Sequence, residues 1–338
     1  MSKSVRLFVL LTGCIAALAY WAFMLVKPET LPESWHYPVE KIGNEPITPI
    51  PLQLGLDIRK VALGKRLFSD PRLSADNQIS CASCHDLNRG GVDGLPHSIG
   101  IGGANGDVNA PTVLNSGLNF RQFWDGRAAT LEDQIDGPVQ NPKEMGAAWP
   151  DVIAKLQSDE GYRRDFAALY PAGIGRETVK DAIATFERAL TTPNAKFDRF
   201  LRGDKDALSG EEYAGYLLFK KSGCISCHQG VNVGGNMYER LGLVANYFEQ
   251  RGKVEKVDFG RYNLTGREEH RYEFRVPSLR NVALTAPYFH DASASTLAEA
   301  VATMGTYQLG VDFQPEEIDK IVKFLHTLTG DQPGALVQ

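Results

Sequence analysis

The sequence has no large excess of charge of either sign and no long run of like charges. Its 338 residues include 36 lysines and arginines and 41 aspartates and glutamates, which gives a formal net charge of −5. A nucleic-acid-binding surface usually shows as a basic excess, and an interaction tail as a run of like charges. We therefore expect no nucleic-acid partner. With 43% hydrophobic residues, the chain is long enough to bury the cores of two ordinary domains.

The sequence also has few segments that alternate as β-strands do. Residues 271–276 (RYEFRV) alternate and predict one short hairpin arm. Helical signals are commoner. Apolar residues recur every three or four positions in 176–190, and a Ser209/Glu212 capping box opens another segment. Residues 314–330 have a proline near their start and a glycine at their end. We predict a mostly α-helical protein.

One uncharged run of about twenty residues stands at the N-terminus, from Leu7 to Val26. As a helix it would span roughly 30 Å, the thickness of the membrane hydrocarbon. Lys3 and Arg6 precede the run, so the positive-inside rule places the rest of the chain outside the cytoplasm. We predict an uncleaved membrane anchor over residues 1–27 and a periplasmic body.

Two alternatives to the anchor remain. Residues 17–19 (ALA) resemble a signal peptidase site, and residues 11–14 (LTGC) resemble the lipobox of bacterial lipoproteins. All three interpretations export the body of the protein. Six prolines follow, too many for a helix or a central strand, so residues 28–52 are predicted to be an extended spacer that holds the body off the membrane.

A weak internal repeat divides the rest of the chain. Residues 109–131 and 275–297 match at a constant offset of 166 positions, with identical proline, asparagine, aspartate, threonine and leucine residues at five of them. Repeats of this kind indicate two similar structural units. We therefore predict two domains, residues 53–195 and 196–338.

Cysteine is scarce, and four of the five cysteines fall in two copies of the pattern C-x-x-C-H. The pattern comprises Cys81, Cys84 and His85 in the first copy and Cys224, Cys227 and His228 in the second. This is the attachment signature of c-type haem. Two sulfurs on one face of a turn bond the vinyl groups, and the adjacent histidine reaches the iron. We predict two covalent haems, which agrees with export.

Other uses of paired cysteines fit less well. The two pairs begin 143 residues apart, whereas a four-cysteine zinc site usually keeps its pairs within about 15–20 residues. A thioredoxin-type pair requires a βαβ setting, which the sequence does not predict. A disulfide would leave the histidine after each pair unexplained.

The second axial position of each iron decides between electron transfer and catalysis. Two methionines are candidates for the second haem. Met237 follows His228 by only nine residues, which leaves little chain to pass around the ring. Met304 has ample length to return over the opposite face, so we predict Met304 as the ligand.

Over residues 57–330 the chain resembles the bacterial di-haem cytochrome c peroxidases, with the MauG proteins as a side branch. The resemblance implies two cytochrome c-like domains, with a low-potential peroxidatic haem in the first and a high-potential electron-entry haem in the second. The matching stretches are CASCHDLNRGGVDG, NAPTVLN, FRQFWDGRAATLEDQIDGPVQNPKEM, TTPNAKFD, GCISCHQGVNVGG, VPSLRNVALTAPYFHD and AVATMGTYQLG.

The resemblance also implies roles for three residues of the first domain. Gln134 and Glu144 match the family's peroxide pocket, where a carboxylate moves a proton from one peroxide oxygen to the other. Trp124 matches the tryptophan that lies between the haems. Without the resemblance, Glu144 would be interpreted as a solvated loop residue and Trp124 as a core residue.

Further expectations concern ligands and partners. The resemblance implies one calcium ion at the domain interface, held by the side chain of Asn109 and the carbonyls of Thr285 and Pro287. It also implies hydrogen peroxide as the oxidant and a small periplasmic c-type cytochrome or cupredoxin as the electron donor. We expect a homodimer.

One loop departs from the family pattern. Many members carry a histidine at the position of Ile101, in a Ser-Ile-Gly-His sequence, and this histidine ligates the peroxidatic iron in the resting oxidised enzyme. Isoleucine cannot ligate. Either His97, in the same glycine-rich loop, takes the role, or the iron has no protein ligand on that face.

Two other functions remain open at this point. A MauG-like di-haem oxidase modifies a partner protein and has a tyrosine as the distal ligand of its second haem; Tyr307 lies close to Met304 in sequence. A non-catalytic di-haem electron carrier would keep both irons six-coordinate. The spin state of the first haem distinguishes a carrier from an enzyme.

Overall fold

The computed structural model describes residues 45–332. The predicted anchor, residues 1–27, and most of the predicted spacer lie outside the described residues. Within residues 45–332, none of the helices combines the length and the apolar character needed to cross a membrane.

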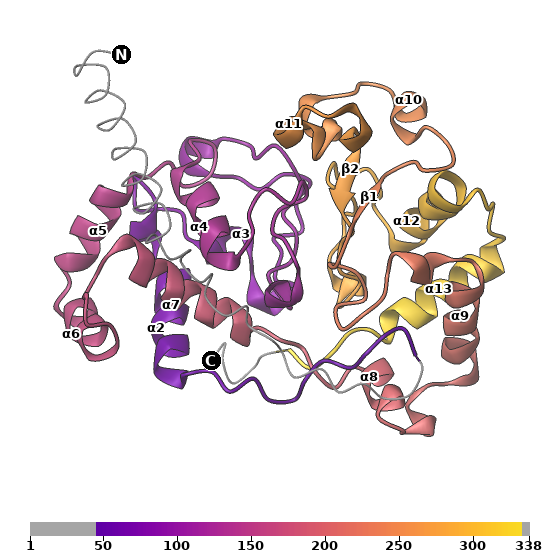
Figure 1. Ribbon diagram of the computed structural model, residues 1–338, viewed down its shortest axis with the longest axis horizontal. Helices are drawn as coiled ribbons and strands as arrows, with labels where there is room; N and C mark the ends of the chain where they lie inside the picture. The colour runs from indigo at the N-terminus through magenta and orange to yellow at the C-terminus, as the bar shows by residue number, and fades with distance from the viewer. Residues whose placement is uncertain (1–44, 333–338) are drawn as a thin grey trace, which may run out of the picture. The chain divides into compact units, whose positions relative to one another are not determined.

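The described chain is mostly helical, as the sequence predicts (Figure 1). Two three-residue strands pair antiparallel with Glu239 opposite Phe274, which confirms the predicted hairpin arm. The helices are α2 (Ile58–Phe68), α3 (Cys81–Cys84), α4 (Leu131–Gln140), α5 (Trp149–Gln157), α6 (Glu160–Leu169), α7 (Arg176–Ala189), α8 (Lys196–Leu201), α9 (Gly210–Lys221), α10 (Tyr247–Arg251), α11 (Tyr262–Thr265), α12 (Leu297–Thr303) and α13 (Pro315–His326), and the strands are β1 (Tyr238–Arg240) and β2 (Glu273–Arg275).

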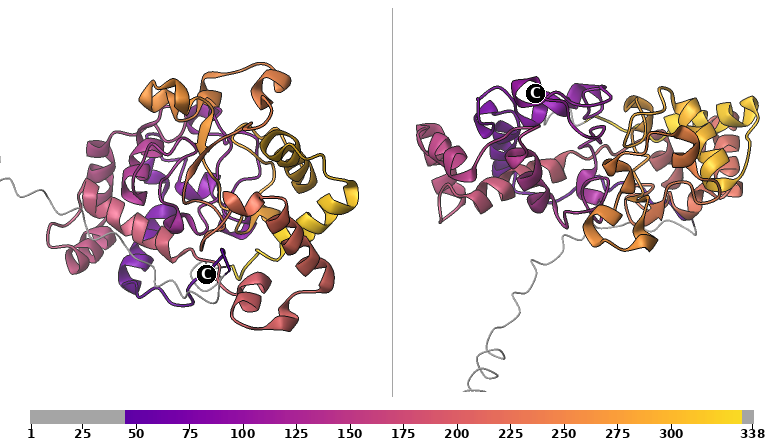
Figure 2. Two further views of the ribbon diagram at one scale, coloured as in Figure 1. Left: turned by 45° about the vertical axis from the view of Figure 1, so that its right-hand side comes forward. Right: turned by 90° about the horizontal axis from the view of Figure 1, so that it is seen from above.

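Two hydrophobic cores organise these elements. One core collects side chains from Val61 to Leu190, and the other collects side chains from Phe197 to Leu328 together with Ile47. The ribbon views show the segments up to α7 and those from α8 onward gathered separately (Figures 1 and 2). Each core therefore draws on a nearly continuous stretch of chain.

A close helix crossing lies at the centre of each core. α2 packs against α7, and α9 packs against α13. A Cβ added at Gly64 of α2 would lie 2.0 Å from the carbonyl oxygen of Ala182, and one added at Gly215 of α9 would lie 2.0 Å from that of Lys320. Because only glycine leaves room for this approach, the two crossings have the same construction.

The end of the predicted spacer is not a free linker. Ile47 and Ile50 are fully buried, and Ile47 belongs to the second core. The backbone N–H of Ile50 donates to Asp198, and the buried guanidinium of Arg280 donates to the carbonyl of Thr48. The prediction of a spacer over residues 28–52 is therefore wrong for residues 45–50, because apolar side chains between the prolines give this segment a place in the second core.

Candidate haem sites and active site

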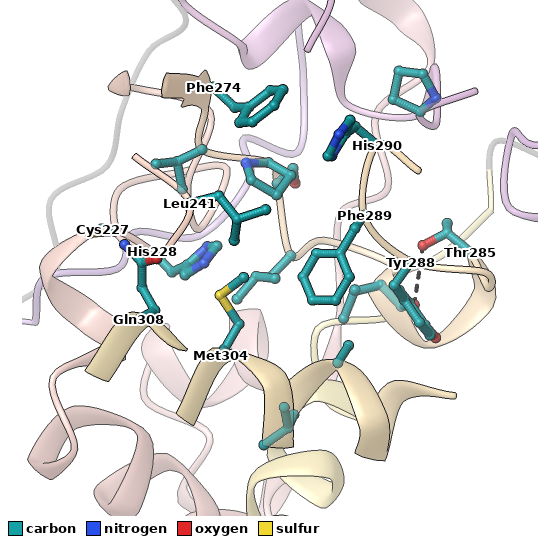
Figure 3. A pocket seen from close by; sticks show the side chains of 18 of the residues that line it. Cys227, His228, Leu241, Phe274, Thr285, Tyr288, Phe289, His290, Met304 and Gln308 are labelled. Atoms are coloured by element: carbon teal, nitrogen blue, oxygen red, sulfur yellow. Dashed lines mark hydrogen bonds between the residues drawn. The ribbon is translucent and has the colours of Figure 1, made fainter. Parts of the chain in front are cut away.

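Two cavities lie next to the two C-x-x-C-H segments. The first cavity, of about 440 Å³, is lined by Cys81, Cys84 and His85. The second cavity, of about 240 Å³, is lined by Cys224, Cys227 and His228 (Figure 3). Each cavity thus has two thiols and an imidazole on its wall.

Both cysteine pairs are free thiols on a single turn. In the first pair the backbone N–H of His85 donates to the carbonyl of Cys81 at 3.0 Å, and in the second that of His228 donates to the carbonyl of Cys224 at 3.0 Å. The same local turn therefore sets each histidine directly after its pair of sulfurs, as thioether attachment to a haem requires.

The two histidines are held in the neutral form that binds iron. Burial lowers the pKa of His228 to about 4 and also lowers the pKa of His85. The Nδ1 atom of His85 donates to the carbonyl of Gly91 at 3.2 Å, which leaves Nε2 as its ligating atom.

Met304 lies on the wall of the second cavity. It follows α12 and begins a π-helical turn, Met304–Leu309, a rare conformation that often occurs at functional sites. Figure 3 shows its thioether and the imidazole of His228 pointing into the cavity. Of the two candidate methionines, Met237 does not line this cavity.

Tyr307 does not line the second cavity. Its hydroxyl donates to Gln250 at 2.9 Å, and its ring packs edge-on against Tyr247. A tyrosine ligand of the MauG type would therefore require this turn to rearrange.

The first cavity contains the two residues implied for peroxide chemistry. Gln134 lies on α4, and Glu144 lies in the turn that follows α4. Burial raises the pKa of Glu144, although a 2.6 Å hydrogen bond from Asn141 and the charge of Arg127 partly oppose this. A carboxyl with a raised pKa is suited to accept and return a proton.

The loop with the isoleucine substitution is tied to the Glu144 turn. The N–H of Ile101 donates to the carbonyl of Glu144 at 2.8 Å, and a Cβ at Gly100 would lie 2.1 Å from the carbonyl oxygen of Lys143. His97 does not line the first cavity; among the described residues on that wall, His85 is the sole histidine.

A shared wall separates the cavities, and Trp124 is part of it. The indole N–H of Trp124 donates to the carbonyl of Asn109 at 2.9 Å, and the N–H of Arg275 donates to the carbonyl of Trp124 at 2.8 Å. The residues that line both cavities are Asn109, Ala110, Pro111, Thr112, Asn119, Trp124, Phe274 and Arg275.

Arg275 was not identified from the sequence. It is 3% exposed and donates to the carbonyls of Phe123 and Val276 and to the side chain of Asn119. Arg275 forms no ion pair with a carboxylate of the described chain, and burial lowers its pKa to about 10. An unpaired buried cation is costly. The acidic propionates of haems in the two cavities would neutralise it, so the residues present fit the cofactor.

The residues implied for calcium lie on the wall of one cavity. Asn109, Thr285 and Pro287 all line the second cavity. The side-chain N–H₂ of Asn109 donates to the carbonyl of Leu95 at 2.9 Å, which leaves its amide oxygen as the atom available to a cation.

A cluster of two aspartates and a histidine was also not identified from the sequence. Asp258, His290 and Asp291 lie close enough to share a metal ion. The guanidinium of Arg251 instead pairs with both carboxylates, at 2.5 Å from Asp258, and His290 Nε2 donates to Asp258 at 2.7 Å. Because Arg251 already supplies the positive charge that a metal ion would bring, we assign this cluster a structural role.

The chain is similar to known proteins over most of its length. Residues 58–206 match the family model described as di-haem cytochrome c peroxidase. The chain is 51% identical over 288 residues to cytochrome c peroxidase Ccp of Escherichia coli K12, an alignment that covers 85% of this chain but 62% of that protein. It is 47% identical over 292 residues to cytochrome c551 peroxidase of Nitrosomonas europaea, covering 86% of each.

A solved structure shares the fold. It is the crystal structure of a MauG-like protein associated with microbial copper homeostasis, with a TM-score of 0.74 and 30% sequence identity. The match covers 90% of this chain and 97% of that one.

Proposed function

This chain belongs to the family of di-haem cytochrome c peroxidases, and from that premise we propose that it reduces hydrogen peroxide to water in the first cavity, with electrons that enter through the second. The observation that carries the proposal is the wall that the two cavities share. The first cavity has the buried carboxyl of Glu144, and the adjoining second cavity has the thioether of Met304. In this proposal the first cavity carries out the proton chemistry and the second receives the electrons, and Trp124 lies on the wall that they share.

In this proposal Glu144 transfers the proton and Gln134 positions the peroxide. A bound haem would supply the iron that binds peroxide and passes electrons. Glu144 takes the proton from one peroxide oxygen and delivers it to the other, and Gln134 orients the substrate beside it. The overall reaction consumes one peroxide, two electrons and two protons and forms two waters. The raised pKa of Glu144 favours its uptake of that proton, because burial stabilises the neutral carboxyl.

The second cavity serves electron entry. Met304 and His228 would hold the iron of a haem there, a donor combination suited to electron transfer rather than to substrate binding. We propose a small periplasmic c-type cytochrome or cupredoxin as the donor. A calcium ion at Asn109, a homodimer and an exported, anchored body are further proposals that rest on the resemblance and on the N-terminal apolar run.

The MauG-like structure makes an oxidase the second candidate. The position of Tyr307, with its hydroxyl bonded to Gln250, argues against that function. The peroxidase and oxidase functions can be distinguished by an assay with purified holoprotein and a reduced small c-type cytochrome. A peroxidase oxidises the cytochrome when peroxide is added. If neither the oxidised nor the half-reduced protein reacts with peroxide, the protein is an electron carrier. Oxidation of a partner protein in place of the cytochrome would indicate the oxidase.

A further inference from the structure

The two helix crossings place different residues at equivalent positions of the two cavities. Cβ atoms added at Gly64 and Gly215 would meet Phe186 on α7 and Phe324 on α13, respectively, so these two phenylalanines are equivalent. The next residue is Glu187 on α7 and Leu325 on α13. Glu187 lines the first cavity and Leu325 lines the second.

Glu187 is buried without a partner. Glu187 is 6% exposed, and its Oε2 atom has no hydrogen-bond partner among the described residues. It lies beside the first thiol: burial and then the charge of Glu187 raise the pKa of Cys81. A carboxyl that replaces an apolar side chain at a cofactor cavity calls for a functional explanation.

Few charges surround this carboxyl. Burial raises the pKa of Glu187 to about 8; Arg188 opposes the shift and Glu132 of α4 adds to it. Arg188 is paired with Glu132 at 2.6 Å and is not free to neutralise Glu187.

On the other elements of the described chain that pack on α7, the charged side chains are paired or at least partly exposed. On α4, Asp136 pairs with Arg176 and Lys180, and Asp133 is exposed. On α2, Lys60 pairs with Asp181 and Arg66 pairs with Asp165, and Lys65 is partly exposed. Residues 116–118 carry no titratable side chain. Glu144 lines the same cavity, and the thiols of Cys81 and Cys84 cannot titrate once they are bonded to a haem.

We propose that Glu187 is the redox-linked proton site of the first cavity. When the first haem gains one electron from the second, the Glu187 carboxylate takes one proton from solvent, and it releases that proton when the haem is reoxidised. The electron adds a negative charge close to the carboxylate, and in a low-dielectric interior this favours protonation. The proposal rests on the proposed function only in assigning a haem to each cavity.

The first haem should then have a pH-dependent reduction potential. As pH rises, the reduced state loses its stabilising proton, so the potential falls. The fall is limited to the range between the pKa of Glu187 with the oxidised haem and its higher pKa with the reduced haem. For a one-electron couple, each tenfold change in proton concentration corresponds to at most about 59 mV. The second haem, with Leu325, should show no such dependence.

The test is spectroelectrochemical titration of the holoprotein between about pH 6 and about pH 9, where a carboxyl with this raised pKa would titrate. The wild type is compared with Glu187→Gln and Glu187→Leu, and no peroxide is present, so the result does not depend on peroxidase activity. We expect a slope for the first haem that both variants lose. Glu132→Gln is the matched control, because it alters the nearby charge without removing the cavity carboxyl, and it should retain a slope.

Redox-difference infrared spectroscopy supplies a second readout. Reduction of the wild type should add a protonated-carboxyl band that is missing in Glu187→Gln and present in Glu132→Gln. A pH-independent potential of the first haem in the wild type would overturn the proposal, as would a Glu187→Gln variant that keeps the wild-type slope. Should Glu187→Gln fail to bind haem, the infrared band in Glu187→Leu and in the wild type decides.

Discussion

The two cavities are built alike and lined differently. Each has a C-x-x-C-H turn, a partly buried neutral histidine and a glycine-mediated helix crossing. The first cavity adds Glu144 and Glu187, whereas the second adds Met304 and Leu325 at its wall. The scaffold thus provides a similar cavity in both units. Under the proposed function, these few side chains would decide whether a cavity handles protons as well as electrons.

Loss of the first cavity's acid/base group should have the largest effect. We expect Glu144→Ala to lower kcat/KM for peroxide by about 10²–10⁴-fold, the range for a positioned acid/base group. Both haem potentials and the optical spectra should stay close to wild type. Glu177→Ala is the control, because that carboxylate is exposed. Unchanged peroxide turnover in Glu144→Ala would remove this residue from the mechanism.

Replacing the thioether of Met304 in the second cavity should change electron entry and leave proton transfer in the first cavity unaltered. We expect Met304→His to retain both haems and to lower the second potential by on the order of 0.1 V or more, because imidazole favours ferrous iron less than a thioether does. Peroxide turnover should fall as a consequence. Met237→Leu, outside the cavity wall, should leave the potential unchanged. An unaltered potential in Met304→His would show that another residue ligates this iron.

The helix crossings test whether the two units are equally constrained. Gly64→Ala and Gly215→Ala each place a Cβ 2.0 Å from a backbone oxygen, so both should destabilise by roughly 1–3 kcal/mol, the usual cost of overpacking. Gly210→Ala, at the start of the helix that contains Gly215, meets nothing within 4 Å and is the control. Chemical denaturation of the three variants measures the difference. A much smaller loss at one crossing would mean that the two cores are not equivalent.

The distal loop should give the smallest effect. Because Ile101 cannot ligate and His97 does not line the first cavity, we expect the oxidised protein to react with peroxide without prior half-reduction. His97→Ala should leave the oxidised spectrum high-spin and unchanged, whereas Ile101→His should introduce a low-spin species. A low-spin wild-type spectrum that disappears in His97→Ala would instead make His97 the ligand.

Features encoded over a few successive residues can be predicted from the amino-acid sequence alone. The C-x-x-C-H turns, the capping box of α9 and the hairpin arm at β2 all depend on local spacing, and the structure shows each of them. The preference for Met304 over Met237 uses only the length of chain needed to reach across a haem. Gln134 and Glu144 require the family resemblance, because their sequence surroundings are ordinary for a helix and a loop.

The remaining features depend on which distant segments pack together. Arg275 and Glu187 belong to residue types that are usually solvated, and they become notable only because the fold buries them at the cavities without an ion-pair partner in the described chain. Ile47 lies in a proline-rich stretch that is typical of a linker, yet the second core encloses it. Burial and the absence of a counter-charge are properties of packed neighbours, so spacing along the chain could not predict them and the tertiary structure decided them.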